Sequence, residues 1–195
     1  MKNKDEKTLV LLKPDAVQRN LIGEIISRFE RVGLKIIAMK FLLPTKEQAY
    51  KHYVKNEEEI TAIGERSIAG KKKNGDVVDD DPTELGQTIV NCLVDFLSQS
   101  PVVAIVLEGS NAIPVVRKLV GSTEPLNSDV GTIRGDFTID SYGLADDDIR
   151  AVRNLVHASA NEFDANYEIS VWFGEEELYS YKNIRDAVLY DKNFN

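Results

Sequence analysis

One histidine combines features that suit phosphate chemistry. His157 lies at the end of the apolar run from Leu155, and Ser159 with Glu162 forms a capping-box pattern that predicts a helix start just beyond the imidazole. The unpaired backbone N–H groups of a helix start attract anions. Imidazole has a pKa close to neutrality, so a large fraction of it is an unprotonated nucleophile at physiological pH. The pattern therefore suggests phosphoryl transfer through His157.

A lone histidine is more often structural, with its ring nitrogens bonded to the backbone, so other residues must decide the role of His157. The second histidine, His52, lies in the polar helical stretch Glu47–Tyr53, with no acidic or cysteine cluster at ligand spacing. We interpret His52 as a surface residue.

Composition limits the class of protein. A chain of 195 residues with 43% hydrophobic content is long enough for one well-packed core, which predicts one domain. Cys92 is the single cysteine, so no internal disulfide can form, and its helical context predicts a buried structural thiol. The net charge of -8 argues against nucleic acid as a specific partner. No segment is long enough to span a bilayer, so we expect a cytoplasmic protein with no membrane partner.

The N-terminal part predicts a strand, a helix and a second strand. The apolar run 8–13 reads as a central strand stopped by a turn, which places Lys13 at a strand end. Residues 21–32 show helical spacing before Gly33, and residues 34–43 predict the second strand. A helix carrying Tyr50 and Tyr53 follows.

The stretch 57–98 predicts an exposed insertion. Its lysine run, 71–73, reads as a solvated loop. Asp81 is expected to cap a helix that packs on the main core. The apolar positions predicted for this helix are Leu85, Ile89, Leu93, Phe96 and Leu97.

The C-terminal part repeats the strand and helix pattern. A strand is predicted over 101–107, a helix from Asn111 to Gly121, a long loop over 122–143 and a last strand over 168–173. In that strand, Glu168 would lie on the face opposite Ile169. The order of elements predicts an α+β fold: a ferredoxin-like sandwich with a four-stranded antiparallel sheet covered by helices, plus the helical insertion.

Three motifs in this order resemble the nucleoside diphosphate kinases. They are Lys13-Pro14-Asp15-Ala16-Val17, Gly131-Thr132-Ile133-Arg134-Gly135-Asp136-Phe137 and Asn154-x-x-His157-x-Ser159, with Glu168 and Trp172-Phe173 downstream. The resemblance implies a single domain of this family over 1–195, with insertions at about 57–98 and 141–150.

The resemblance also implies the reaction and its central residues. A nucleoside triphosphate would give its γ-phosphate to His157, and a nucleoside diphosphate would collect it from the phosphohistidine in a ping-pong exchange. Glu168 matches the glutamate that bonds the other ring nitrogen. Ser159 matches a supporting serine that bonds this glutamate.

Positive charge around the phosphates is the main requirement of phosphoryl transfer. By resemblance, Lys13 reaches the sugar hydroxyl and the transferred phosphate, while two arginines and a threonine hold the phosphates. The resemblance places Tyr53 near the histidine and Asn154 on the ribose. The implied nucleotide-binding residues are Lys13, Tyr53, Arg117, Thr123, Arg134 and Asn154.

Mg²⁺ is the expected cofactor, held through the nucleotide phosphates because no protein cage for a metal is visible. The chain departs from the family at two places. Ala160 stands where many members have an acidic residue, and Ile60 or Ile63 would replace the phenylalanine that clamps the base.

The expected partners are nucleoside triphosphates and diphosphates, and the family pattern implies a homo-oligomer, with a hexamer favoured. Two alternatives stay open. The departures at Ala160 and the base clamp would suit a non-catalytic nucleotide-binding or assembly protein on the same fold. Transfer of the phosphate from His157 to protein partners is the other.

Overall fold

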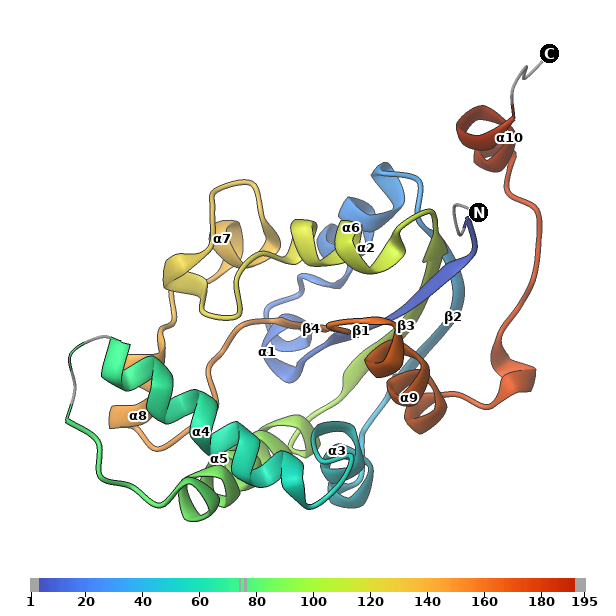
Figure 1. Ribbon diagram of the computed structural model, residues 1–195. Helices are drawn as coiled ribbons and strands as arrows, with labels where there is room; N and C mark the ends of the chain where they lie inside the picture. The colour runs from blue at the N-terminus through green and yellow to red at the C-terminus, as the bar shows by residue number, and fades with distance from the viewer. Residues whose placement is uncertain (1–3, 74, 76, 192–195) are drawn as a thin grey trace.

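The computed structural model describes residues 4–73, 75 and 77–191. Within them, four strands form one antiparallel sheet in the order β2-β3-β1-β4 (Figure 1). The strands are β1 (Glu6–Leu12), β2 (Lys35–Leu42), β3 (Val102–Gly109) and β4 (Val156–Ala158). With α2 between β1 and β2 and α6 between β3 and β4, the predicted ferredoxin-like sandwich is confirmed.

Helices cover both faces of the sheet (Figure 1). They are α1 (Pro14–Gln18), α2 (Ile22–Arg31), α3 (Lys46–Tyr53), α4 (Glu58–Lys73), α5 (Pro82–Ser98), α6 (Ala112–Val120), α7 (Ile133–Phe137), α8 (Tyr142–Asp147), α9 (Glu162–Trp172) and α10 (Ile184–Tyr190), with short 3-10 turns η1 (Pro125–Asn127) and η2 (Glu175–Glu177). The predicted loop over 122–143 therefore contains η1, α7 and the start of α8.

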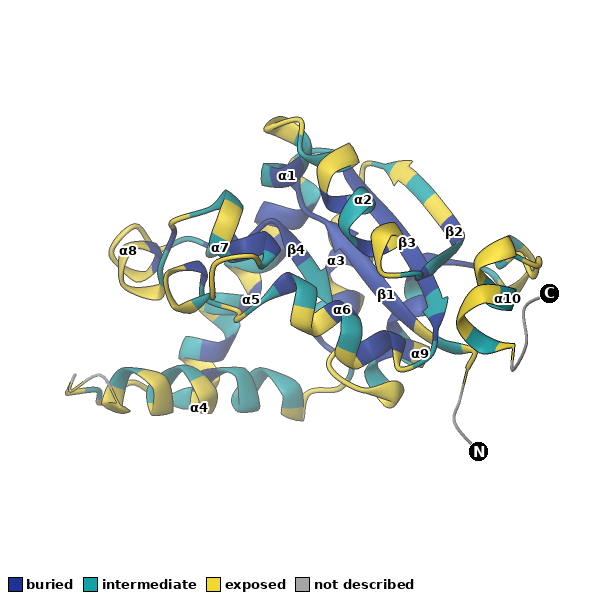
Figure 2. Cartoon of the chain, turned by 90° about the horizontal axis from the view of Figure 1, so that it is seen from above, coloured by how far each residue is buried: buried dark blue, intermediate teal, exposed yellow. Residues whose placement is uncertain are grey.

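The alternation of β1 divides the core into two layers. Leu9 and Leu11 pack with α3, α5 and α9 on one face, while Val10 and Leu12 pack with α2 and α6 on the other. Buried residues are concentrated along β1 and β3 (Figure 2). A strand buried on both faces reads as a continuous apolar run, which explains why β1 and β3 were easy to predict.

The predicted last strand over 168–173 is wrong, because these residues belong to helix α9 and its C-cap, Phe173. The side chain of Asn161 starts the helix by accepting a hydrogen bond from the backbone N–H of Asp164. The buried residues recur at helical spacing: Ala165, Glu168, Ile169 and Trp172. The predicted strand covers only six residues, which are too few to reveal a helical period. The buried Glu168 also interrupts the apolar pattern.

The first insertion forms a hairpin of α4 and α5 whose closest approach depends on two glycines. A Cβ added to Gly64 would lie 1.8 Å from the carbonyl oxygen of Pro82, and one on Gly86 would lie 1.9 Å from that of Ile60. This contact turns the stripe of Gly86, Val90 and Val94 inward. The predicted stripe is wrong at its first three positions, since Leu85, Ile89 and Leu93 are only half-buried, although Phe96 and Leu97 are buried.

Two smaller expectations about this insertion are also wrong. The lysines 71–73 form the last turn of α4 rather than a loop, where positive charge suits the negative helix end. Cys92 is half-buried rather than buried, and its Sγ donates to the carbonyl of Ile149 at 3.5 Å. Asn74, which follows the lysines, lies outside the described residues.

The segment from Asp140 to Arg150 folds around α8 and is closed by an ion pair. The guanidinium of Arg150 donates to both carboxylate oxygens of Asp140, at 2.6 and 2.9 Å. Lys71 of α4 pairs with Asp146 of α8 at 3.2 Å. The two stretches that we predict as insertions are therefore in contact. None of the described helices is long and apolar enough to cross a bilayer.

A pair of alanine substitutions tests the glycine contact. Gly64→Ala should lower the free energy of unfolding by about 1–3 kcal/mol, because the methyl group overlaps the backbone of Pro82. Gly70→Ala in the same helix meets nothing within 4 Å and should raise stability by about 0.5–1 kcal/mol. Denaturant unfolding of both variants measures the difference, and equal effects would contradict this account of the packing.

Candidate active site

His157 is positioned by the short pairing of β4 with β1, in which it lies opposite Leu11. Val156 packs in the layer of α2 and α6, so alternation turns His157 to the other face, where α3 and α9 lie. Its side chain is about 21% exposed. The predicted histidine therefore stands at an edge of the sheet, partly open to solvent.

Glu168 of α9 orients the imidazole of His157. The Nε2 atom of His157 lies 2.9 Å from Oε2 of Glu168, and the hydroxyl of Ser159 donates to the same oxygen at 2.6 Å. Because this oxygen accepts both bonds, Nε2 carries the ring proton and Nδ1 has the free lone pair. Both of these contacts were expected, although Glu168 reaches His157 from a helix and not from a strand.

Ser159 supports the site. The prediction that it caps the following helix, α9, is wrong. The Oγ of Ser159 accepts a hydrogen bond from the backbone N–H of Leu9 at 3.2 Å, and the hydroxyl donates to Glu168 at 2.6 Å, much closer than the Leu9 carbonyl at 3.4 Å. The cap is Asn161, two residues later. The helix start is therefore shifted away from the imidazole relative to the predicted capping box.

Lys13 and Asn154 form a buried pair beside the histidine. The Lys13 Nζ donates to Oδ1 of Asn154 at 2.9 Å, and the Asn154 Nδ2 donates to the carbonyl oxygen of Thr123 at 2.8 Å. Burial, together with the positive charge of Arg134, lowers the pKa of Lys13 to about 8, against the opposing effect of Asp15. The cation is thus short of anionic partners, which suits an anionic ligand.

Arg134 has a structural task that the sequence did not indicate. The Leu155 carbonyl accepts a hydrogen bond from Lys13 N–H, just after β1, and Ser159 N–H donates to the Leu9 carbonyl of β1. Because successive carbonyls alternate in direction, those of Asn154 and Val156 point to the free edge of β4. Arg134 donates to these two carbonyls at 3.2 and 2.6 Å. It also donates to the carbonyls of Gly121 and Ser122, and its burial lowers its pKa to about 10.

Arg117 and Thr123, the other expected phosphate-binding residues, lie near Arg134 and Asn154. Arg117 of α6 is exposed, and its positive charge contributes to the lowered pKa of Arg134. Thr123 is exposed and reaches Asn154 through its carbonyl. Ile60 and Ile63, expected near the base, pack partly buried against the layer of α3, α5 and α9.

Asp15, which belongs to the motif Lys13-Pro14-Asp15, holds the turn that leads into β4. Its Oδ2 accepts the backbone N–H of Leu155 at 3.0 Å. Leu155 has φ +66°, a conformation that is rare for leucine, and Val156 N–H closes the turn onto the Asn154 carbonyl at 2.7 Å. The only indication of this role in the sequence is that Asp15 belongs to the motif Lys13-Pro14-Asp15.

The interpretation of His52 as a surface residue is wrong. Its side chain lies in the last turn of α3, only 2% exposed, and its ring centroid is 4.3 Å from that of His157. Tyr53 beside it is half-buried, and its hydroxyl is buried without a hydrogen-bond partner among the described residues. The family resemblance placed Tyr53 near His157, but it gave no such role to the adjacent His52.

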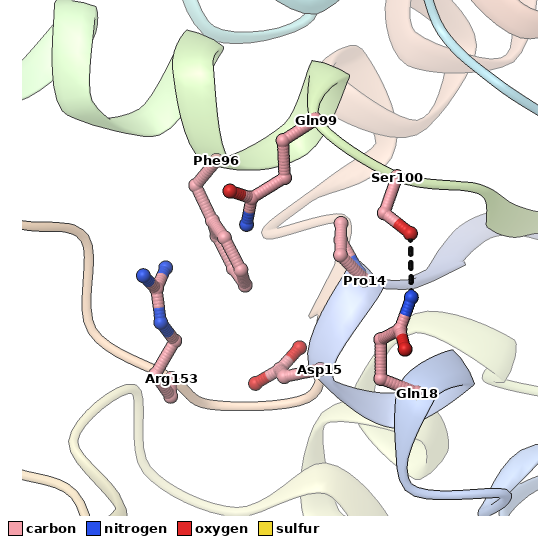
Figure 3. Close-up of a pocket in the computed structure, with 7 residues that line it drawn as sticks. All are labelled: Pro14, Asp15, Gln18, Phe96, Gln99, Ser100 and Arg153. Carbon is pink, nitrogen blue, oxygen red and sulfur yellow. Dashed lines mark hydrogen bonds between the residues drawn. The ribbon is translucent and has the colours of Figure 1, made fainter.

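A cavity of about 380 Å³ lies between α1 and the end of α5 (Figure 3). The guanidinium of Arg153 stacks on the ring of Phe96 at 3.9 Å. Asp15 faces this cavity from α1, and Gln18 donates to Ser100 at 2.8 Å. The cavity contains none of the predicted site residues.

Comparisons with known proteins identify the family of this chain. The family model described as nucleoside diphosphate kinase matches residues 6–62 and 83–178. The chain belongs to the nucleoside diphosphate kinase family. Its reaction class is phosphotransfer, and the break between the matched stretches falls within the first predicted insertion.

Individual relatives match over nearly their full length. A nucleoside diphosphate kinase from Pyrobaculum aerophilum is 46% identical over 178 residues, which are 89% of this chain and 97% of that protein. The crystal structure of an NDP kinase from that organism is similar with a TM-score of 0.84 and 44% identity, over 90% of this chain and 100% of that one.

A second solved relative is the nucleoside-diphosphate kinase from Borrelia burgdorferi, whose structure is a transition-state mimic with bound vanadate and ADP. Its TM-score is 0.77 at 40% identity, over 94% of this chain and 96% of that one.

The lowered pKa of Lys13 predicts the pH dependence of this kinase. Lys13 loses its charge as pH rises through about 8, so kcat/KM for ATP should fall about tenfold per pH unit above that value. Initial rates at low ATP between pH 6.5 and 10 measure this limb. Lys13→Arg stays charged and should lack it, while a wild-type kcat/KM that is flat to pH 10 would contradict the assignment.

Proposed function

We propose that the chain exchanges phosphate between nucleoside triphosphates and diphosphates through a phosphohistidine at His157. The single observation that carries this proposal is the hydrogen bond from His157 Nε2 to Glu168, which leaves Nδ1 as the nucleophilic nitrogen. Nδ1 attacks the γ-phosphorus, and the bond to the bridging oxygen breaks with its electron pair leaving on the nucleoside diphosphate. A second diphosphate then reverses the step.

Glu168 acts on the charge that develops during transfer. As the bond to phosphorus forms, the imidazole becomes positively charged, and the carboxylate that accepts Nε2–H stabilises this charge. Ser159 keeps the carboxylate in place through its own hydrogen bond. This arrangement requires no proton to leave His157 during transfer.

The cations supply the electrostatic stabilisation that phosphoryl transfer requires. Lys13 reaches the transferred phosphate, with Arg117, Arg134 and Thr123 on the remaining phosphate oxygens. The guanidinium of Arg134 already donates four hydrogen bonds to carbonyls, so it offers one further N–H. Asn154 binds the ribose, and Tyr53, whose buried hydroxyl has no hydrogen-bond partner among the described residues, binds near the transferred phosphate.

Mg²⁺ enters with the nucleotide as part of the substrate. It prefers oxygen ligands, and the two carboxylates of the site are already engaged. Asp15 accepts the backbone N–H groups of Ala16 and Leu155, and Glu168 accepts from His157 and Ser159. A metal ion held by phosphate oxygens and water therefore suits this site better than a protein-bound one.

We also propose a homo-oligomer, with a hexamer favoured, in a chain organised as one domain over 1–195 with insertions at about 57–98 and 141–150. The edge of β2 supports an interface. Tyr179 N–H donates to the Ile37 carbonyl at 2.9 Å and covers the first half of this edge. Beyond it, Met39, Phe41 and Leu43 are 56%, 64% and 60% exposed, an apolar edge that a second copy would bury.

A labelling experiment tests the reaction. Incubation with γ-labelled ATP and Mg²⁺ should transfer label to the protein in a bond that survives alkali but not acid. An added nucleoside diphosphate should then remove it as a new triphosphate. His157→Ala should remain folded and lose exchange by a factor on the order of 10⁴ or more. Nucleotide binding without label in the wild-type protein would favour the non-catalytic alternative.

Changing the apolar edge of β2 tests the assembly. Phe41→Glu should shift the mass measured by light scattering from that of six chains towards smaller species, because it places charge in the buried interface. Val77→Glu, at an exposed apolar position in the α4–α5 connection, should leave the mass unchanged. A Phe41→Glu hexamer would show that the interface lies elsewhere.

A further inference from the structure

His52 is a buried imidazole that packs directly on the nucleophile. Its ring stands edge-to-face against that of His157, with centroids 4.3 Å apart and planes at 82°. The rings of Tyr53 and Trp172 flank it at 4.8 and 5.7 Å. A side chain enclosed in this way cannot turn freely, so the placement of its two nitrogens is defined by its hydrogen bonds.

The hydrogen bonds of His52 determine its tautomer. Trp172 Nε1–H, which can only donate, donates to Nδ1 of His52 at 3.3 Å. Burial, with electrostatic repulsion from the neighbouring His157, Lys13 and Lys55, lowers the pKa of His52 well below its ordinary value. The ring is therefore neutral at pH 7, with its one proton on Nε2.

This Nε2–H has no acceptor in the described part of the chain, although it is fully buried. A buried donor without a partner is destabilising and is uncommon in folded proteins. The hydroxyl of the adjacent Tyr53 is also buried without a hydrogen-bond partner among the described residues. Two neighbouring donors at the end of α3 thus lack acceptors in the described part of the chain, and the ring that carries one of them packs on the ring of His157.

A metal ion is the other ligand that this cluster could attract. A nitrogen of His52, a nitrogen of His157 and an oxygen of Glu168 lie within 4.8 Å of one another. Coordination by His52 Nε2 would need a lone pair on that atom, which moves the proton to Nδ1. Nδ1–H would then face the Trp172 N–H, and two donors cannot form a hydrogen bond with each other. The hydrogen bond from Trp172 therefore disfavours metal coordination by His52 Nε2.

The geometry points to His52 Nε2–H as a hydrogen-bond donor to the phosphoryl group carried by His157, with Trp172 holding the tautomer that makes it a donor. This inference rests on the proposed phosphohistidine. A neutral donor suits the position because it binds a phosphate oxygen without repelling the imidazole of His157 as that ring becomes positive. His52 thereby stabilises the phosphoenzyme relative to the free enzyme.

Two amide substitutions separate the two nitrogens of His52. The amide N–H of Gln can occupy the place of Nε2–H, so His52→Gln keeps the donor, whereas His52→Asn keeps only an acceptor near Trp172. The measurement is the equilibrium between ATP with free enzyme and ADP with labelled phosphoenzyme. His52→Asn should lower the phosphoenzyme fraction at fixed ATP/ADP by about 10- to 100-fold in the equilibrium constant, the usual effect of a hydrogen bond to a charged group. His52→Gln should stay within about threefold of wild type.

The ¹⁵N resonances of His52 give a readout that a packing role would not move. In the free wild-type protein Nε2 should be protonated and Nδ1 should not, and the Nε2–H signal should shift on phosphorylation. Equal phosphoenzyme constants for His52→Asn and His52→Gln, or inhibition by Zn²⁺ that His52→Asn abolishes, would overturn the inference. A wild-type protein that takes no label contradicts the proposed function itself, which is a distinct outcome.

Discussion

The short pairing of β4 with β1 is the constraint on which the rest of the site depends. β4 has only three residues and lies at an edge of the sheet, so its pairing with β1 alone leaves one side of its backbone without partners. Arg134 supplies these partners by donating to two outward carbonyls, and Asp15 holds the strained turn before the strand. The direction of the His157 ring follows from this backbone.

Burial of positive charge links stability to ligand binding in this site. Lys13 and Arg134 are both buried, and this burial lowers the pKa of each more than the nearby Asp15 raises it. Removing cations from water is unfavourable, and a bound polyphosphate offsets that effect while the cations neutralise its charge. An acidic chain with a net charge of -8 can therefore bind an anion, because the local field and not the total charge acts on the ligand.

The α4–α5 hairpin is continuous with the fold that carries the site. Val90, Val94 and Leu97 of α5 belong to the same core layer as Ile169 and Trp172 of α9. Helix α3, which carries His52 and Tyr53, is packed between α5 and α9. The hairpin thus helps to enclose the buried donors behind the nucleophile, and its glycine contact stabilises this side of the molecule.

The sequence by itself determined the elements with a strong local period and the residues within short motifs. The strands β1 and β3 and the helices α2 and α6 were predicted because periodicity is a property of neighbouring residues. The family motifs named Lys13, Asn154 and His157 as candidate site residues. The ferredoxin-like fold class was predicted from the order of elements, although the fourth strand was placed at 168–173 instead of at β4. Glu168 was identified by resemblance although its element was wrong.

Only the tertiary structure decided the surroundings of the nucleophile. His52 and Trp172 are 120 residues apart in the chain, and no local pattern reports a hydrogen bond between them. Helix α9 was not predicted because Glu168 lies on its buried face. A charged residue is expected at a buried position only when its hydrogen-bond partners are known, and here these are His157 and Ser159. The carbonyl contacts of Arg134 likewise exist only once β4 lies at the sheet edge. Contacts between distant segments depend on packing, and packing is a property of the folded chain as a whole.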